Sequence, residues 1–99
     1  MTLKSCLVKH PFDFSGKVAM ITGGSSGIGF ETARMLLAGG ARVLISGRDE
    51  IKGELAVREL EKGTGQKGHF VKADVSVPDQ CEKIINAAVQ RYGTIDIVI

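Results

Sequence analysis

The chain has 99 residues, enough for one domain, and its content of 43% hydrophobic and 24% charged residues is typical of a globular protein and not of a disordered one. The net charge is only +2, the charges are spread along the chain without a basic stripe, and only 5% of the residues are aromatic. These features disfavour nucleic acid as a partner. No run of about 18 apolar residues is present, so we expect no membrane-spanning helix.

The beginning of the chain differs in character from the rest. Residues 1–15 have little periodicity and contain Pro11 as a breaker, and we interpret them as a leader before a domain at 16–99. Met1 to His10 lacks the apolar core of a secretory signal. Cys6 and Cys81 match neither a metal-ligand spacing nor a disulfide framework, so we expect two reduced thiols, no metal site and a cytoplasmic protein.

From Lys17 onward the pattern becomes regular. The apolar run Val18–Ile21 predicts a strand that is buried on both faces. A Gly/Ser cluster follows it, and then a helix that ends at Gly39-Gly40. The buried stripe of this helix is expected at Ile28, Ala33, Leu36 and Leu37.

A second strand and helix come next. Val43–Ile45 predicts another buried strand, and Asp49 and Glu50 lie where a helix N-terminus favours negative charge. Gly63 and Gly65 are expected to close this helix. Its inward face is predicted at Ile51, Leu55 and Leu60.

The last third repeats the pattern. Phe70–Ala73 predicts a short third strand, and Ser76 to Asp79 has capping-box spacing, with Pro78 in the first turn of a third helix. Gly93 is expected to stop this helix, and Ile95–Ile99 begins a fourth strand. Helical periodicity is clearest at Cys81, Ile84, Ile85, Ala88 and Val89.

Strands that alternate with helices indicate crossover units around a parallel sheet, so the fold class is α/β. The final run Ile97–Ile99 is apolar and has no polar cap after it. Because an unpaired strand edge in the middle of a sheet is unfavourable, we expect a piece of a longer polypeptide, cut after the start of its fourth strand.

The turn from Thr22 to Gly29 joins the first strand to the first helix, whose N-terminus offers free N–H groups to a phosphate. We expect Gly23 to make the tight turn, Gly27 to let a pyrophosphate approach and Gly29 to let the helix pack closely. Ser25 and Ser26 add hydroxyl donors. The spacing Gly-x-x-x-Gly-x-Gly is neither the Gly-x-Gly-x-x-Gly fingerprint nor a P-loop, and a plain tight turn is the alternative.

The tip of the second strand bears on the choice of cofactor. In dinucleotide-binding α/β folds an acid there binds the ribose 2′-hydroxyl of NAD, whereas this chain reads Ser46-Gly47-Arg48. Arg48 can pair with a 2′-phosphate through two charge-assisted bonds, with Ser46 as a helper, so NADP(H) is favoured over NAD(H). Alternatively, Arg48 is a solvated surface residue. Asp49 is expected to cap the next helix, although a shifted loop could bring it to a ribose.

Asp74 and Val75 follow the third strand at the carboxyl edge of the sheet, where ligands bind in open α/β folds. Asp74 could equally be a turn residue that begins the Ser76 cap region. The spacing alone leaves both interpretations open.

Taken together, these residues resemble the short-chain dehydrogenases/reductases over Phe14 to Ile99. The motifs that carry the resemblance are Gly16-Lys17-Val18-Ala19, Thr22-Gly23-x-x-x-Gly27-Ile28-Gly29, Gly40-Ala41, Asp74-Val75 and Gly93-x-Ile95-Asp96. The resemblance implies a Rossmann-type doubly wound sheet in an NADP(H)-dependent oxidoreductase that is dimeric or tetrameric. The cofactor-binding positions it implies, together with the reasoning above, are Gly23, Ser25, Ser26, Gly27, Ile28, Gly29, Arg48, Asp74 and Val75.

The resemblance also implies what these residues lack. Members of the family continue into Asn-Asn-Ala-Gly and later carry a catalytic Ser and a Tyr-x-x-x-Lys, none of which occurs here. Tyr92 is the single tyrosine, and the residue four positions later is Asp96, so no catalytic residue is assigned. A second basic marker of NADP(H) preference is absent, because Ser26 occupies its position. His10 and His69 have no partner pattern and are interpreted as surface or structural residues.

We therefore expect the NADP(H)-binding portion of a reductase or dehydrogenase whose substrate is a small carbonyl or alcohol. The alternative is a noncatalytic nucleotide-binding or interaction module, or a nonfunctional truncated product. Specificity in this fold resides in later loops, so the sequence predicts no particular substrate.

Overall fold

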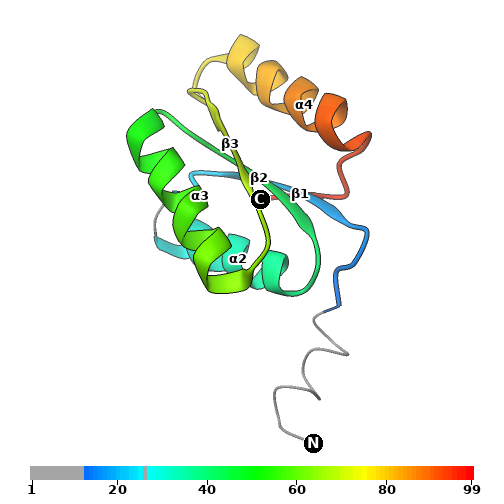
Figure 1. Cartoon of the computed structure of the whole chain (residues 1–99). Helices are drawn as coiled ribbons and strands as arrows, with labels where there is room; N and C mark the ends of the chain where they lie inside the picture. Colours follow the sequence, from blue (N-terminus) through cyan, green and yellow to red (C-terminus); the bar gives the residue numbers. More distant parts are fainter. Residues whose placement is uncertain (1–12, 26) are drawn as a thin grey trace, which may run out of the picture.

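The computed structural model describes residues 13–25 and 27–99 and contains the predicted alternation of strands and helices (Figure 1). Most of the predicted leader, and Ser26 of the glycine-rich turn, lie outside the described residues. The elements in chain order are β1 (Val18–Thr22), α2 (Gly27–Ala38), β2 (Arg42–Gly47), α3 (Glu50–Thr64), β3 (His69–Lys72), α4 (Pro78–Tyr92) and β4 (Ile97–Val98).

The four strands form one sheet in the order β3-β2-β1-β4, and every pair is parallel. In Figure 1 helices α2 and α3 cover one face of this sheet and α4 covers the other. Asp96 joins β4 to β1, because its carboxylate accepts a hydrogen bond from the Val18 amide at 2.9 Å. The predicted α/β fold with a parallel sheet is therefore confirmed.

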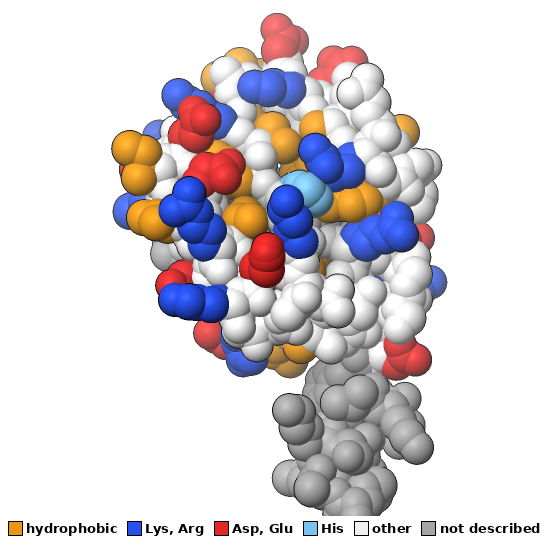
Figure 2. All heavy atoms as spheres, viewed as in Figure 1, with side chains coloured by type: hydrophobic (Ala, Val, Ile, Leu, Met, Phe, Trp, Pro, Cys, Tyr) orange, Lys and Arg blue, Asp and Glu red, His pale blue; other side chains and the backbone are white. Residues whose placement is uncertain are grey.

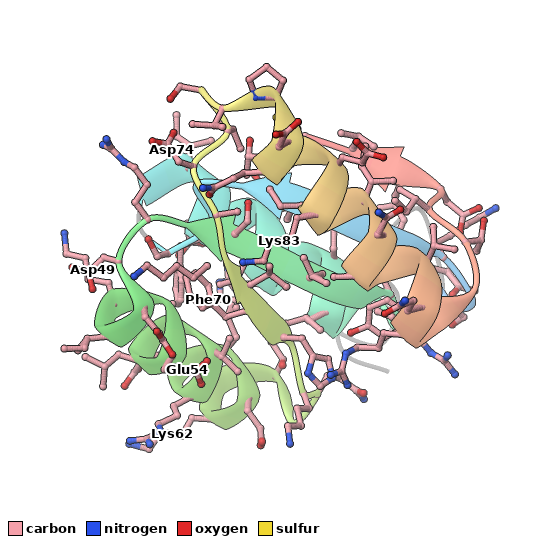
Figure 3. All side chains as sticks on the ribbon, turned by 90° about the horizontal axis from the view of Figure 1, so that it is seen from above. Asp49, Glu54, Lys62, Phe70, Asp74 and Lys83 are labelled. Atoms are coloured by element: carbon pink, nitrogen blue, oxygen red, sulfur yellow. The ribbon has the colours of Figure 1, made fainter. Side chains whose placement is uncertain are left out.

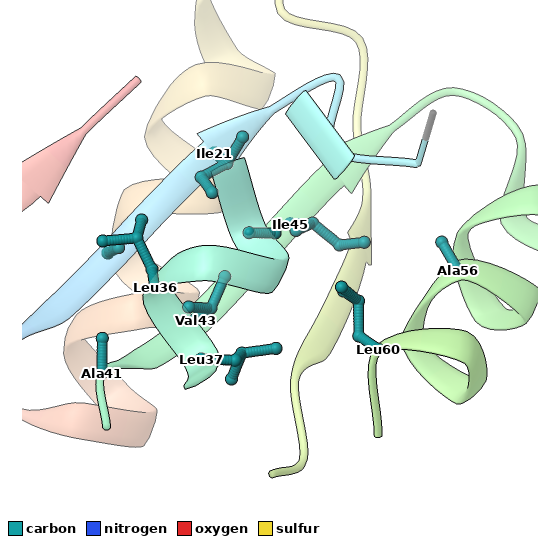
Figure 4. Close-up of a cluster of buried hydrophobic side chains, with 10 residues drawn as sticks. Ile21, Leu36, Leu37, Ala41, Val43, Ile45, Ala56 and Leu60 are labelled. Carbon is teal, nitrogen blue, oxygen red and sulfur yellow. The ribbon is translucent and has the colours of Figure 1, made fainter. Parts of the chain in front are cut away.

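Two apolar clusters hold the helices on the sheet. The larger one lies between the sheet and the helices α2 and α3 (Figure 4) and consists of Ala19, Ile21, Ala33, Leu36, Leu37, Ala41, Val43, Ile45, Ala56 and Leu60. The smaller one lies under α4 and consists of Met20, Leu44, Ala73, Ile84 and Ala88. Because both faces of β1 and β2 are covered, these strands read as continuous apolar runs.

The inward faces of α2 and α3 were only partly predicted. Ala33, Leu36 and Leu37 are buried as expected, but Ile28 is 86% exposed. It precedes Ala33 by five residues, and at about 100° per residue this places it about 140° around the helix from that buried residue. In α3 the prediction was wrong for two of three residues: Leu60 is buried, whereas Ile51 and Leu55 are exposed.

Small residues form the inward face of α3 instead. Gly53, Ala56 and Leu60 are its buried positions, and the ring of Phe70 from β3 lies directly against Gly53 (Figure 3). A Cβ atom on Gly53 would overlap that ring, so the helix can approach the sheet edge only with glycine there. Hydrophobic periodicity does not detect a face that is built from glycine and alanine.

The start of α4 also differs from the prediction. The N-cap is Val77, which makes no side-chain capping bond, so the predicted Ser76 capping box is wrong. The hydroxyl of Ser76 donates instead to Asp74, two residues earlier. Pro78 occupies the first turn as predicted.

The predicted stripe of α4 is half buried. Ile84 and Ala88 pack against the sheet, whereas Ile85 and Val89 are 45% and 44% exposed. Helices α3 and α4 end at Gly65 and Gly93 in the left-handed conformation, and Gly63 lies inside α3 instead of closing it.

Candidate functional site

The carboxyl ends of β1, β2 and β3 meet at one edge of the sheet, because the strands are parallel. An open cavity of about 890 Å³ lies at this edge. Its walls come from the turn after β1, the start of α3 and the segment after β3, and they consist of Gly23, Ser25, Ser46, Gly47, Arg48, Asp49, Glu50, Ile51, Lys52, Lys72, Ala73, Asp74 and Val75.

The turn after β1 is held close to the sheet and to the start of α2. Gly23 has a φ of 71°, and its amide donates to the Ser46 carbonyl at 2.8 Å. A Cβ atom on Gly29 would lie 2.6 Å from the Gly23 carbonyl oxygen, so α2 can begin this close to the turn only without a side chain there. Gly27, at the first position of α2, has a φ of 62°.

Sequence reasoning overlooked Gly24, the second glycine of this turn. A Cβ atom on Gly24 would lie 2.6 Å from Cγ2 of Ile45 on β2, so the backbone of the turn rests directly on the neighbouring strand. The signal was present in the consecutive glycines Gly23-Gly24, but the motif spacing assigns no role to the second of them.

The structure brings five of the predicted binding residues around the cavity and separates the others from it. Gly23, Ser25, Arg48, Asp74 and Val75 line the cavity, whereas Gly27, Ile28 and Gly29 do not. Gly29 acts through close packing of the helix start, and Ile28 points into solvent. Ser26 lies outside the described residues.

Arg48 follows β2 directly and is exposed at the cavity wall. The one ion pair among residues 13–25 and 27–99 joins Arg34 to Glu31, so Arg48 forms no salt bridge with a described carboxylate. Asp49 is turned onto the start of α3, where its Oδ1 accepts from the Lys52 amide at 3.1 Å. Its predicted role as a helix cap is confirmed.

Asp74 forms a tight turn in the segment after β3, which also lines the cavity. Its Oδ1 accepts from the Ser76 hydroxyl at 2.6 Å and from the Ser76 amide at 2.9 Å. The hydroxyl bond first, then the amide bond, and less strongly the charge of Arg48, hold the pKa of Asp74 below its ordinary value. Asp74 is therefore both a turn residue and a cavity residue. Figure 3 shows Asp49 and Asp74 at the same end of the molecule.

Three further residues line the cavity or border it. Lys52 and Lys72 line the cavity, although sequence reasoning did not select them; Lys52 is four positions after Arg48 and Lys72 is the last residue of β3. Ser46 borders the cavity but is 0% exposed, and its hydroxyl has no hydrogen-bond partner in the structure. Because that hydroxyl is covered, the expectation that Ser46 helps to bind a phosphate is not supported by its position.

The basic residues Arg48, Lys52 and Lys72 line this cavity together with the acidic residues Asp49, Glu50 and Asp74, so charges of both signs border the tight glycine turn. The guanidinium and ammonium groups among these residues can pair with the phosphates of a nucleotide. No group of three or more acidic, histidine or cysteine side chains within the described ranges could hold a metal ion. In the same part of the chain, no helix has the length and apolar character needed to cross a membrane.

Comparisons with known proteins agree with this geometry. The model of the family described as short chain dehydrogenase matches residues 17–99. The short chain dehydrogenase/reductase astE of Aspergillus oryzae is 35% identical over 91 residues, which cover 92% of this chain and 35% of that protein. Granaticin polyketide synthase putative ketoacyl reductase 1 of Streptomyces violaceoruber is 45% identical over 82 residues, covering 83% of this chain and 30% of that protein.

A solved structure is similar over the same region. The L-sorbose reductase of Gluconobacter frateurii, in complex with NADPH and L-sorbose, superposes with a TM-score of 0.84 at 31% identity, and the match covers 90% of this chain and 34% of that one. The chain thus spans about a third of the length of the relatives it matches.

Proposed function

Because the chain belongs to the short chain dehydrogenase family, we propose that its cavity binds the adenosine end of NADP(H). The observation that carries the proposal is the placement of Arg48, which lines the same cavity as the glycine-rich turn and forms no salt bridge among the described residues. In this proposal residues 16–99 are the cofactor-binding part of a larger oxidoreductase domain.

The glycine-rich turn fits the pyrophosphate of the cofactor. The absence of side chains at Gly24 and Gly29 leaves the backbone of the turn pressed against β2 and the start of α2. The N-terminus of α2 then offers unpaired amides and a partial positive charge to a phosphate. Gly23, Ser25, Ser26, Gly27, Ile28 and Gly29 form this cradle in the proposal.

Arg48 fits the ribose 2′-phosphate. A guanidinium can donate two parallel bonds to a phosphate, and Asp49, the nearest carboxylate in sequence, is occupied by the amide of Lys52. In this proposal Asp74 and Val75, which also line the cavity, contact the adenine. This arrangement favours NADP(H) over NAD(H), because NAD(H) has no 2′-phosphate.

For the whole protein we propose hydride transfer between NADP(H) and a carbonyl or alcohol substrate. The cofactor supplies the hydride when it is bound, and these 99 residues bind and orient its adenosine end. The L-sorbose reductase complexed with NADPH is consistent with this reaction class.

The test is a titration of the chain with NADPH and with NADH, read by cofactor fluorescence and by thermal shift. We expect saturable binding with a preference for NADPH, and a loss of about tenfold to a hundredfold in NADPH affinity in Arg48→Ala, since hydrogen bonds between charged groups contribute about 1.5–3 kcal/mol. The affinity for NADH should change little.

Arg58→Ala is the matched control, because Arg58 is an exposed arginine of α3 outside this cavity. It should leave both affinities unchanged. Equal losses of NADPH and NADH affinity in Arg48→Ala would contradict a role in reading the 2′-phosphate.

A further inference from the structure

A second group of charged side chains lies at the opposite edge of the sheet, where the parallel strands begin. Arg42 is the first residue of β2 and His69 is the first residue of β3. Helix α4 runs back to this edge and ends at Tyr92, with Arg91 before it. The topology therefore brings three basic side chains from three elements together, at the end of the sheet away from the candidate cofactor cavity.

The contacts within this group are close. Nη1 of Arg91 lies 3.4 Å from Nε2 of His69, and the rings of His69 and Tyr92 lie 6.0 Å apart between centroids. The guanidinium carbon of Arg42 is 6.0 Å from the centroid of the same tyrosine ring. Tyr92 is thus the aromatic centre around which the basic groups gather.

Among the described residues, no salt bridge offsets the positive charge of this group, although the carboxylate of Glu54 acts on His69. Arg42, His69 and Arg91 form no ion pair with any described carboxylate. Partial burial first, then the charges of Arg91 and Lys67, lower the pKa of His69, and the carboxylate of Glu54 alone opposes them. On the face seen in Figure 2, lysine and arginine side chains lie on more than one side of the histidine, and acidic side chains lie on the same face.

A cavity of about 450 Å³ opens beside His69 and Arg91. The other residues that line it are Gln90 and the apolar residues Leu44, Phe70, Val71 and Ala87. The group therefore offers a guanidinium, an imidazole and an amide around one space, and all three can donate hydrogen bonds. The cavity does not share a residue with the candidate cofactor cavity.

We propose that this cavity is an anion site, in which Arg91, His69 and Gln90 bind a phosphate group. A doubly charged tetrahedral oxyanion matches the fork of Arg91 and neutralises the like charges that the fold holds together. The phosphate group can belong to inorganic phosphate or to a small phosphate monoester, and the chemistry that recognises it is the same for both.

The test follows the ring protons of His69 by NMR in the chain, with the two histidines distinguished by His10→Gln. Titrations in chloride are compared with titrations at equal ionic strength that contain inorganic phosphate, glycerol phosphate or acetate. A bound dianion within about 4–6 Å should raise the pKa of His69 by about one unit, a tenfold change in proton affinity, in a saturable manner. Acetate, with a single charge, should have a much smaller effect.

Arg91→Gln should abolish the response to phosphate, and Arg91→Lys should retain part of it. The exposed Arg58→Gln, on α3 outside this cavity, is the control and should respond as the parent chain does. Arg48→Ala should also respond fully, so failure of the proposed cofactor site leaves this test intact.

Two results would overturn the proposal. One is a pKa of His69 that is the same in chloride and in phosphate. The other is an unchanged phosphate response in Arg91→Gln, which would leave Arg91 with only a favourable interaction with the C-terminal end of α4.

Discussion

Gly47 occupies the tip of β2, the position at which a carboxylate would select the ribose hydroxyl of NAD(H). A Cβ atom there would lie 3.6 Å from the Phe70 ring and 3.9 Å from the Ser25 hydroxyl, both ordinary contact distances. The position thus accepts a Cβ atom at ordinary contact distances. Its chemical effect on cofactor choice can therefore be tested separately from any effect on folding.

Gly47→Asp should lower the affinity for NADPH by about tenfold or more. The new carboxylate would repel the 2′-phosphate, and a repulsion of about 1.4 kcal/mol is enough for a tenfold loss of affinity. The affinity for NADH should be retained or improved. Binding of both cofactors is measured by fluorescence titration.

Gly47→Asn is the matched control, since it has the same shape without the charge, and it should keep the preference for NADPH. If the Asp and Asn variants lose NADPH affinity equally, the effect is steric and the proposed position of the 2′-phosphate is wrong.

The contact between the β1 turn and α2 depends on the absence of a side chain at Gly29. Gly29→Ala would place a Cβ atom 2.6 Å from the Gly23 carbonyl oxygen, and backbone cannot move aside as a flexible side chain can. We expect a destabilisation of about 1–3 kcal/mol, measured by chemical or thermal unfolding.

Gly63→Ala provides the comparison, because Gly63 lies inside α3 and a Cβ atom added there would have no atom within 4 Å. Alanine there should stabilise the chain by up to about 1 kcal/mol, as expected for an exposed helix interior. A Gly29→Ala variant as stable as the parent would mean that the helix start does not pack as closely as the geometry indicates.

The elements themselves were predictable because each carries a local signal. Buried strands read as apolar runs, and the left-handed caps at Gly40, Gly65 and Gly93 mark helix ends. The inward face of α3 was not predictable, since Gly53 is buried only because Phe70, 17 positions later in the sequence, packs against it. The cap of α4 failed for a similar reason: Ser76 bonds back to Asp74 instead of forward to the helix.

For the whole molecule, parallel topology accounts for most of what the sequence revealed about the site. Arg48 and Asp74 each follow a strand, and parallel strands place their carboxyl ends at one edge, so both residues could be assigned to one site before any contact was known. Lys52 and Lys72 could not, because a lysine on a helix or at a strand end is ordinarily solvated. The proximity of Arg42, His69 and Arg91 could not be predicted either, because it depends on the direction in which α4 returns across the sheet.

The most direct test of the proposed cofactor site is phosphorus NMR of adenosine 2′,5′-bisphosphate added to the chain, because this ligand contains the adenosine end of NADP(H) and nothing else. We predict that the 2′-phosphate resonance shifts saturably, and that Arg48→Ala abolishes this shift while Arg58→Ala does not. A 2′-phosphate resonance that does not respond to the chain, or that responds equally in Arg48→Ala, would contradict the assignment of this cavity to NADP(H).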